Sequence, residues 1–146
     1  MSDRSRPIPK LRPEERHTIR PIGCDREPPP ELLLGIHQFN AGEYWECHET
    51  LEEIWAREPG GVRYLYQGIL LVGVGMLHLQ RGNHHGALTK LASGLELLTA
   101  FEPSCLGIDV SRLRREAEPT LNLLIGGSER MLEARSLPAP AIHAPG

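Results

Sequence analysis

An apolar segment between two glycine-containing turns places the strongest constraint on the fold of this chain. Residues 62–81, VRYLYQGILLVGVGMLHLQR, lie between the turn sequences PGG and GN. As a helix, this segment would carry apolar side chains on almost every side. A helix of this length without a continuous polar face is stable only when neighbouring helices cover it. The sequence therefore predicts a helical bundle with this segment at its centre.

Four further helical segments flank the central one. Turn sequences, capping residues and leucine spacing place them near residues 31–40, 43–57, 84–101 and 110–124. Pro119 is expected to kink or divide the last of them. No strand alternation of useful length appears, and the connections are short. We therefore expect an all-α fold, a compact antiparallel bundle of four to five helices.

Prolines are concentrated at both ends of the chain, where they repeatedly remove backbone donors and helical dihedral angles. The expected organisation is a basic, Pro-rich arm over residues 1–30, a helical bundle domain over residues 31–124 and a C-terminal tail over residues 125–146. We expect the arm to be extended and the tail to be frayed.

The composition limits the classes of partner. The chain has 146 residues, 40% hydrophobic and 24% charged, which fits one soluble domain. Only the arm is basic, whereas residues 31–100 are acidic, so we expect no nucleic-acid partner. The longest apolar run, residues 69–77, is too short to span a bilayer, and the first residues lack a signal-peptide core. We therefore expect no membrane partner and a cytoplasmic location.

Three cysteines, Cys24, Cys47 and Cys105, are widely spaced and odd in number. This pattern matches neither a disulfide framework nor a zinc knuckle, and it is more typical of a reducing cytoplasm. Cys47 is expected to pack in the core as a small apolar side chain.

The second predicted helix carries polar side chains at the edge of its apolar face. At about 100° per residue, His48 and Glu52 are stacked one turn apart at that edge. Trp45 and Trp55 lie on either side of them, and Glu49 lies just beyond. Geometry alone therefore makes this histidine and glutamate half-buried.

The central helix has a stripe that matches this edge, running from Gln67 to His78 with two apolar residues between them. If this stripe faces His48, a polar cluster forms between the two helices. Gly68 and Gly75 lie on a different stripe of the same helix. Because glycine lowers helix propensity, we expect these two positions to allow a close approach by a neighbouring helix.

Three roles fit such a cluster. In the first, the polar groups bond one another because an unpaired buried group costs about 1–3 kcal/mol. In the second, His48 acts in acid–base catalysis, oriented by Glu49 or Glu52, while Gln67 binds a substrate oxygen. In the third, His48 and Glu52, spaced as HExxE, hold a divalent metal ion with a third ligand such as His78.

We expect a binding or scaffold module that associates with itself, because short loops and apolar helices offer grooves but no evident catalytic loop. The candidate binding residues are Gln67, His78, Trp45 and Trp55. The alternative is a small acid–base or metal-dependent hydrolase that uses His48 with Glu49 or Glu52. A divalent metal is the less favoured cofactor. The sequence leaves open the small-molecule ligand and whether the chain is an enzyme.

Four blocks of the sequence resemble a known family. FNAGEYWECHETLEEIW, YQGILLVGVGMLHLQRGN, GALTKLASGLELL and LGIDVSRL are similar, in this order, to the blocks of the small all-helical family DUF309, a domain of unknown function. The resemblance covers about residues 31–124. It implies a compact helical bundle and no established activity. It also implies a family pattern centred on His48, Glu49, Glu52, Trp55, Gln67 and Gly68.

Overall fold

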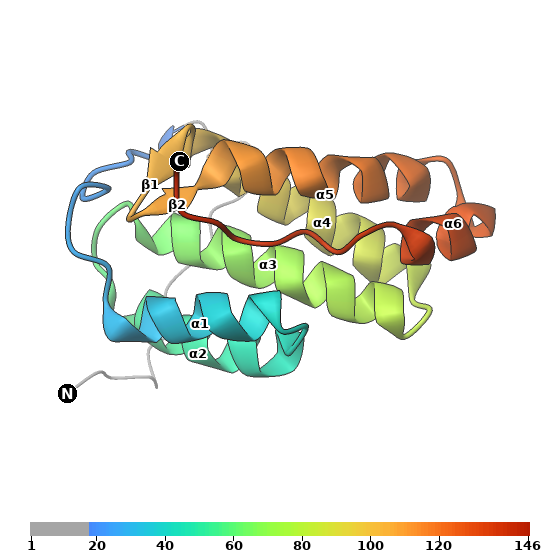
Figure 1. The fold of residues 1–146 in the computed structure, drawn as a ribbon, viewed down its shortest axis with the longest axis horizontal. Coiled ribbons are helices and arrows are strands. Elements are labelled where there is room, and N and C mark those ends of the chain that lie inside the picture. The colour runs from blue at the N-terminus through green and yellow to red at the C-terminus, as the bar shows by residue number, and fades with distance from the viewer. Residues whose placement is uncertain (1–17) are drawn as a thin grey trace.

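The computed structural model describes residues 18–146. Figure 1 shows helices packed side by side, with a short hairpin at one end of the bundle. The elements are α1 (Pro30–Asn40), α2 (Tyr44–Arg57), α3 (Arg63–Gln80), α4 (His84–Leu98), η2 (Thr99–Phe101), β1 (Ser104–Cys105), β2 (Ile108–Asp109), α5 (Val110–Ile125), η3 (Ser128–Arg130) and α6 (Met131–Ser136). The predicted all-α fold is confirmed.

Three local features differ from the sequence expectation. The helix α6 lies within the predicted tail, and β1 pairs with β2 as an antiparallel hairpin. Each of these strands has two residues, and so short a strand has no alternation to detect. Pro119 lies inside α5, and the helix nevertheless continues to its end at Ile125.

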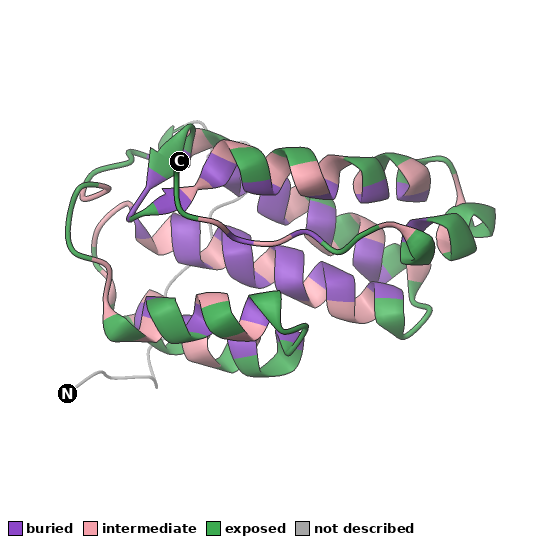
Figure 2. Cartoon of the chain, in the orientation of Figure 1, coloured by how far each residue is buried: buried purple, intermediate pink, exposed green. Residues whose placement is uncertain are grey.

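The helix α3 lies at the centre of the bundle, as its apolar sequence predicts. It packs against α2 on one side and α4 on the other. Ten of its eighteen residues are buried, more than in any other helix of the described residues. Figure 2 shows this burial along its whole length. No helix in residues 18–146, α3 included, combines the length and hydropathy needed to cross a membrane.

Glycines bring the backbones of α3 and α4 together. A Cβ atom at Gly94 would lie 2.8 Å from the carbonyl oxygen of Gly68 and 2.9 Å from the backbone nitrogen of Val72. A Cβ atom at Gly75 would lie 2.9 Å from the backbone nitrogen of Leu91. Real Cβ atoms do not approach backbone atoms this closely, so the close approach predicted for Gly68 and Gly75 is confirmed, with α4 as the neighbour.

The C-terminal tail is extended, but the expectation that it is frayed is wrong. The side chain of Asn40 donates to the carbonyl of Ile142 (2.9 Å) and accepts from the backbone N–H of the same residue (2.7 Å). The N–H of Asp109 donates to the carbonyl of His143, and the N–H of Ala141 donates to Glu116. Figure 1 shows the tail running back beside α3 towards the hairpin. The residues between the prolines keep their N–H groups, and these groups hold the tail.

The expectation that the cysteines match no disulfide is also wrong. Cys24 and Cys105 form a disulfide between positions 81 residues apart. The N–H of Leu106 donates to the carbonyl of Cys24, and Arg26 pairs with Glu58 at 2.8 Å. This pairing depends on where the hairpin places Cys105, which the spacing in the sequence does not report. The predicted arm is described only from residue 18 onward, so the expectation for residues 1–17 lies outside the described part.

The remaining cysteine, Cys47, is buried and unpaired, as predicted. Burial raises the pKa of its thiol to about 12. A thiol with so high a pKa holds almost no thiolate near neutral pH, so Cys47 acts as a core residue.

The glycine contact between α3 and α4 gives a first prediction. Gly75→Ala should lower the free energy of unfolding by about 1–3 kcal/mol. The added Cβ would lie against the backbone nitrogen of Leu91, and a backbone atom cannot move aside as the end of a flexible side chain can. The matched control is Gly73→Ala in the same helix, where the added Cβ has its nearest contact at 3.6 Å. This control should be neutral or stabilising by up to about 1 kcal/mol. Urea unfolding of both variants measures the difference, and equal effects would contradict the backbone contact.

The attachment of the tail gives a second prediction. Asn40→Ala removes two hydrogen bonds to Ile142 and should lower the free energy of unfolding by about 1–3 kcal/mol. The control is Asn122→Ala, an exposed position on α5, which should change stability by less than about 0.5 kcal/mol. Hydrogen exchange of the Ile142 amide should also become faster in Asn40→Ala. Unchanged protection of that amide would show that the asparagine does not hold the tail.

Candidate functional site

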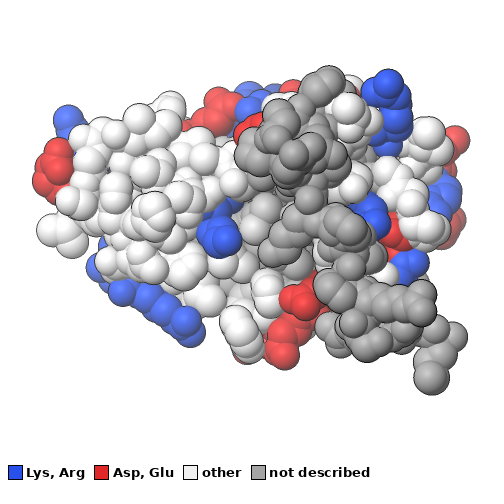
Figure 3. Space-filling model, turned by 180° about the vertical axis from the view of Figure 1, so that it is seen from behind, with Lys and Arg blue, Asp and Glu red and all other residues white. Residues whose placement is uncertain are grey.

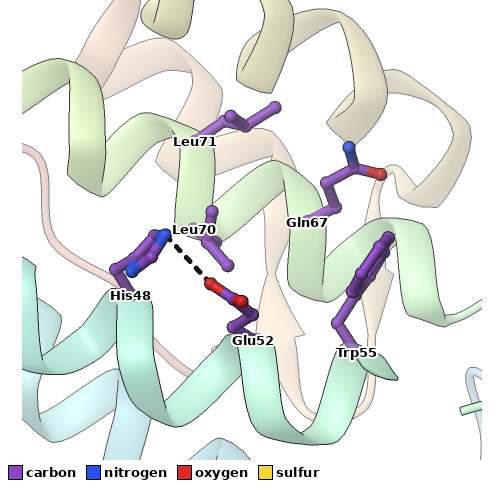
Figure 4. A pocket seen from close by; sticks show the side chains of 6 residues that line it. All are labelled: His48, Glu52, Trp55, Gln67, Leu70 and Leu71. Carbon is purple, nitrogen blue, oxygen red and sulfur yellow. Dashed lines mark ion pairs between the residues drawn. The ribbon is translucent and has the colours of Figure 1, made fainter. Parts of the chain in front are cut away.

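A pocket of about 120 Å³ lies between α2 and α3. Figure 4 shows His48, Glu52 and Trp55 along α2, with Leu70 of α3 pointing toward His48 and Glu52. We call it the α2–α3 pocket, and its lining consists of His48, Glu52, Trp55, Gln67, Leu70 and Leu71. It lies where the polar edge of α2 meets the predicted stripe of α3, so helix geometry correctly anticipated that these residues meet. Their roles stay predictions.

His48 forms one wall of the pocket together with Glu52. Its Nε2 lies 3.2 Å from Oε2 of Glu52, one turn further along α2. Its ring stacks on the indole of Trp45, with centroids 5.3 Å apart and planes 18° apart. Its other nitrogen, Nδ1, is buried and has no hydrogen-bond partner among residues 18–146. The ring is thus held in place while one nitrogen is left unpaired.

Trp55 forms the opposite wall and is covered by Arg63, the first residue of α3. The guanidinium carbon of Arg63 lies 4.9 Å from the centroid of the indole, which is a cation–π contact. Burial lowers the pKa of Arg63, because desolvation disfavours the charged form, although Tyr64 and Glu58 act in the opposite direction. Nε1 of Trp55 and two nitrogens of Arg63 are buried without a hydrogen-bond partner in the described part of the chain.

Gln67 contributes the acceptor of the pocket. Its Oε1 atom is also buried and unpaired within residues 18–146. Leu70 and Leu71 follow it on α3 and complete an apolar wall. Three lining residues thus carry a buried polar atom without a partner in residues 18–146: a donor on Trp55, an acceptor on Gln67 and a ring nitrogen on His48 that can take either part.

Three of the predicted site residues lie elsewhere. Glu49 is exposed, and Trp45, although stacked on His48, is 51% exposed and does not line the pocket. His78 follows Gln67 by about three turns of α3, which corresponds to about 16 Å along the helix axis at a rise of 1.5 Å per residue. There its Nδ1 lies 3.2 Å from the side-chain nitrogen of Asn83. His78 therefore does not line the pocket with Gln67, and its role as a binding residue stays a prediction.

The structure does not assemble the metal site that the HExxE spacing allowed. Within residues 18–146, no group of three or more His, Cys, Asp or Glu side chains is placed to hold a metal ion. His48 and Glu52 supply two ligand groups, and His78, the third ligand considered from the sequence, does not line the pocket with them.

Sequence reasoning missed Arg63 and Leu70. The spacing in the sequence could have indicated Arg63, because it lies four residues before Gln67 and hence on the same face of α3. Its stacking on Trp55 was not predictable, because that contact depends on how α2 and α3 cross.

The unpaired amide of Gln67 gives a third prediction. Gln67→Met keeps a long unbranched side chain and removes the buried unpaired oxygen, so it should raise the free energy of unfolding by about 1 kcal/mol. The control is Gln80→Met at the exposed end of α3, with an expected change below about 0.5 kcal/mol. Chemical denaturation measures both. A loss of stability in Gln67→Met would instead show that the amide is a satisfied structural group.

Comparisons with known proteins support the resemblance. A family model described as "Domain of unknown function (DUF309)" matches residues 32–89, whereas the sequence blocks extended it to about residue 124. The chain is 36% identical over 86 residues to "Uncharacterized protein YpuF" of Bacillus subtilis, covering 57% of this chain and 48% of that protein. It is 24% identical over 107 residues to an "Uncharacterized protein" of Aquifex aeolicus, covering 72% of this chain and 32% of that protein.

The chain thus spans about half or less of the length of these relatives. No solved structure matches it significantly. The matched residues 32–89 include α1, α2, α3 and the start of α4, and with them every residue that lines the α2–α3 pocket. The family match therefore confirms that this part of the chain is similar to the DUF309 family.

Proposed function

We propose that this chain is a binding module whose α2–α3 pocket holds a small polar ligand. The observation that carries the proposal is that three lining residues, His48, Trp55 and Gln67, each present a buried polar atom without a partner in residues 18–146. Each such atom costs about 1–3 kcal/mol when it is left unpaired. A polar ligand that paired with these atoms would recover part of that free energy on binding.

The volume and chemistry of the pocket limit the ligand. A cavity of about 120 Å³ equals about four water molecules at roughly 30 Å³ each. Sites for drug-sized molecules are larger, about 300–1,000 Å³. The ligand is therefore a small molecule or the end group of a larger one. It combines an acceptor for Trp55 with a donor for Gln67, and it packs against Leu70 and Leu71.

The fourth prediction tests binding directly. Acetate, acetamide and methylammonium represent the smallest anionic, neutral and cationic groups that fit the pocket. At least one of them should shift the indole N–H resonance of Trp55 saturably in ¹H–¹⁵N spectra of the full chain. Trp55→Phe removes this donor and should weaken binding about tenfold, measured on the backbone amide resonances of Gln67 and Leu70, as expected for the loss of one well-placed hydrogen bond.

Trp45→Phe is the matched control, because Trp45 does not line the pocket and phenylalanine keeps an aromatic ring that can stack on His48. It should bind the same probe with unchanged affinity. The proposal fails if none of the three probes gives a saturable shift. It also fails if Trp45→Phe and Trp55→Phe lose affinity equally.

Acid–base chemistry is the second candidate function, and one observation favours it. His48 and Glu52 form a pair at 3.2 Å on the wall of the pocket, and a carboxylate in that position can orient an imidazole. A reaction of this kind would need His48 itself, so turnover of a bound molecule would stop in His48→Gln. The exposed Glu49 would be dispensable.

Self-association and a cytoplasmic location stay predictions, as do the expectations of no nucleic-acid and no membrane partner. Figure 3 shows a broad area without Lys, Arg, Asp or Glu, at the end of the molecule where the α3–α4 turn and α6 lie. Such an uncharged area is consistent with contact between copies of the chain. The Cys24–Cys105 disulfide removes the cysteine argument for a reducing compartment.

A further inference from the structure

Arg63 has an unpaired edge beside the α2–α3 pocket. Its Nε and Nη2 atoms lie on the same edge of the planar guanidinium, and both are buried without a partner in residues 18–146. The guanidinium carbon lies 4.9 Å from the ring centroid of Trp55, which lines the pocket. Gln67 follows one turn later on the same face of α3. Arg63 itself does not line the pocket, but its guanidinium contacts a residue that does.

Arg114 is also half-buried, but its guanidinium, unlike the Nε and Nη2 edge of Arg63, has several partners. Arg114, with a side chain that is 23% exposed, donates to the carbonyl of Leu95 and to Glu102, and it also pairs with Glu118 at 3.3 Å. Its charge is thus compensated on several sides. The Nε and Nη2 atoms of Arg63 have no such partner among the described residues.

The neighbouring acid, Glu58, interacts with Arg63 through its charge but forms no hydrogen bond with the Nε and Nη2 atoms, and its oxygens bind other donors. Oε1 of Glu58 accepts from Arg26 at 2.8 Å, and Oε2 accepts from the backbone N–H of Gly60 at 2.9 Å. The first turn of α3 has no acidic residue and no side-chain cap. Arg63 thus adds a positive charge at the positive end of the helix dipole, which is unfavourable, and Glu58, which also pairs with Arg26, is the acid that offsets it.

We propose that the Nε and Nη2 edge of Arg63 binds an oxyanion, the carboxylate or phosphate group of the ligand. This edge can donate two parallel hydrogen bonds to such a group, and stacking on Trp55 fixes its plane. The inference rests on the proposed function, since the rest of the ligand lies against Trp55 and Gln67. Both nitrogens are shielded from solvent, so the atoms that cover this edge move aside when the oxyanion binds.

The fifth prediction concerns this edge. Sodium acetate and inorganic phosphate are titrated into the full ¹⁵N-labelled chain, with sodium chloride at matched ionic strength. At least one oxyanion should shift the Nε–H resonance of Arg63 saturably, and chloride should not. The response to acetate or to phosphate tells which group the site prefers. Arg63→Gln should weaken binding of that oxyanion about tenfold or more, because two charge-assisted hydrogen bonds are lost; the indole N–H resonance of Trp55 reports binding in this and the other Arg63 variants.

The control is Arg81→Gln, which removes the same charge from an exposed position just after α3. It should leave the affinity unchanged. Arg63→Lys keeps the charge but loses the planar edge, so it should also bind weakly, and it carries the test if Arg63→Gln does not fold.

Equal binding by the chain and by Arg63→Lys would overturn the inference, as would an equal loss in Arg81→Gln or the same shift with chloride. Saturable binding of acetamide without binding of acetate or phosphate would also overturn it, while leaving the proposed binding function intact. Failure of every probe would remove both proposals.

Discussion

The backbone contact between α3 and α4 is the constraint on which the remaining structure depends. Gly68 and Gly94 face each other so closely that a side chain at Gly94 would meet backbone atoms of α3. As a result, α3 packs more extensively against α4 than against α2. On the α2 side, long side chains such as Trp55 and Gln67 lie between the two helices, and the α2–α3 pocket lies among them. One helix thus has a close-packed side and a side with a pocket.

Two specific links, one made of hydrogen bonds and one covalent, attach the segments outside the main helices to the bundle. The clamp between Asn40 and Ile142 fixes the tail across the end of α1. The disulfide between Cys24 and Cys105 joins the segment before α1 to the β1–β2 hairpin. Each link connects parts of the chain that are remote in sequence. The disulfide also restricts the unfolded chain, because it closes a long loop, whereas the hydrogen bonds of Asn40 act only in the folded state.

The α2–α3 pocket combines ordered and unsatisfied groups. His48 is held by Glu52 and Trp45, and the guanidinium of Arg63 is held over Trp55. These contacts fix the positions of the side chains, yet buried atoms on His48, Arg63, Trp55 and Gln67 have no partner in the described residues. A core selected only for stability would pair such atoms or replace them with apolar groups. Fixed positions with unpaired atoms are what a preorganised binding site requires.

The sequence by itself predicted helices α1 to α5, the central place of α3 and the meeting of His48, Glu52 and Gln67. These features follow from the 3.6-residue period and from the burial of apolar faces, which are local properties. Only the tertiary structure decided the other features. Cys24 meets Cys105, the tail is held by Asn40, Arg63 stacks on Trp55, and His78 lies away from the pocket. Each of these depends on the angle and spacing at which separate elements cross, and neither quantity is encoded in the pattern of any single element.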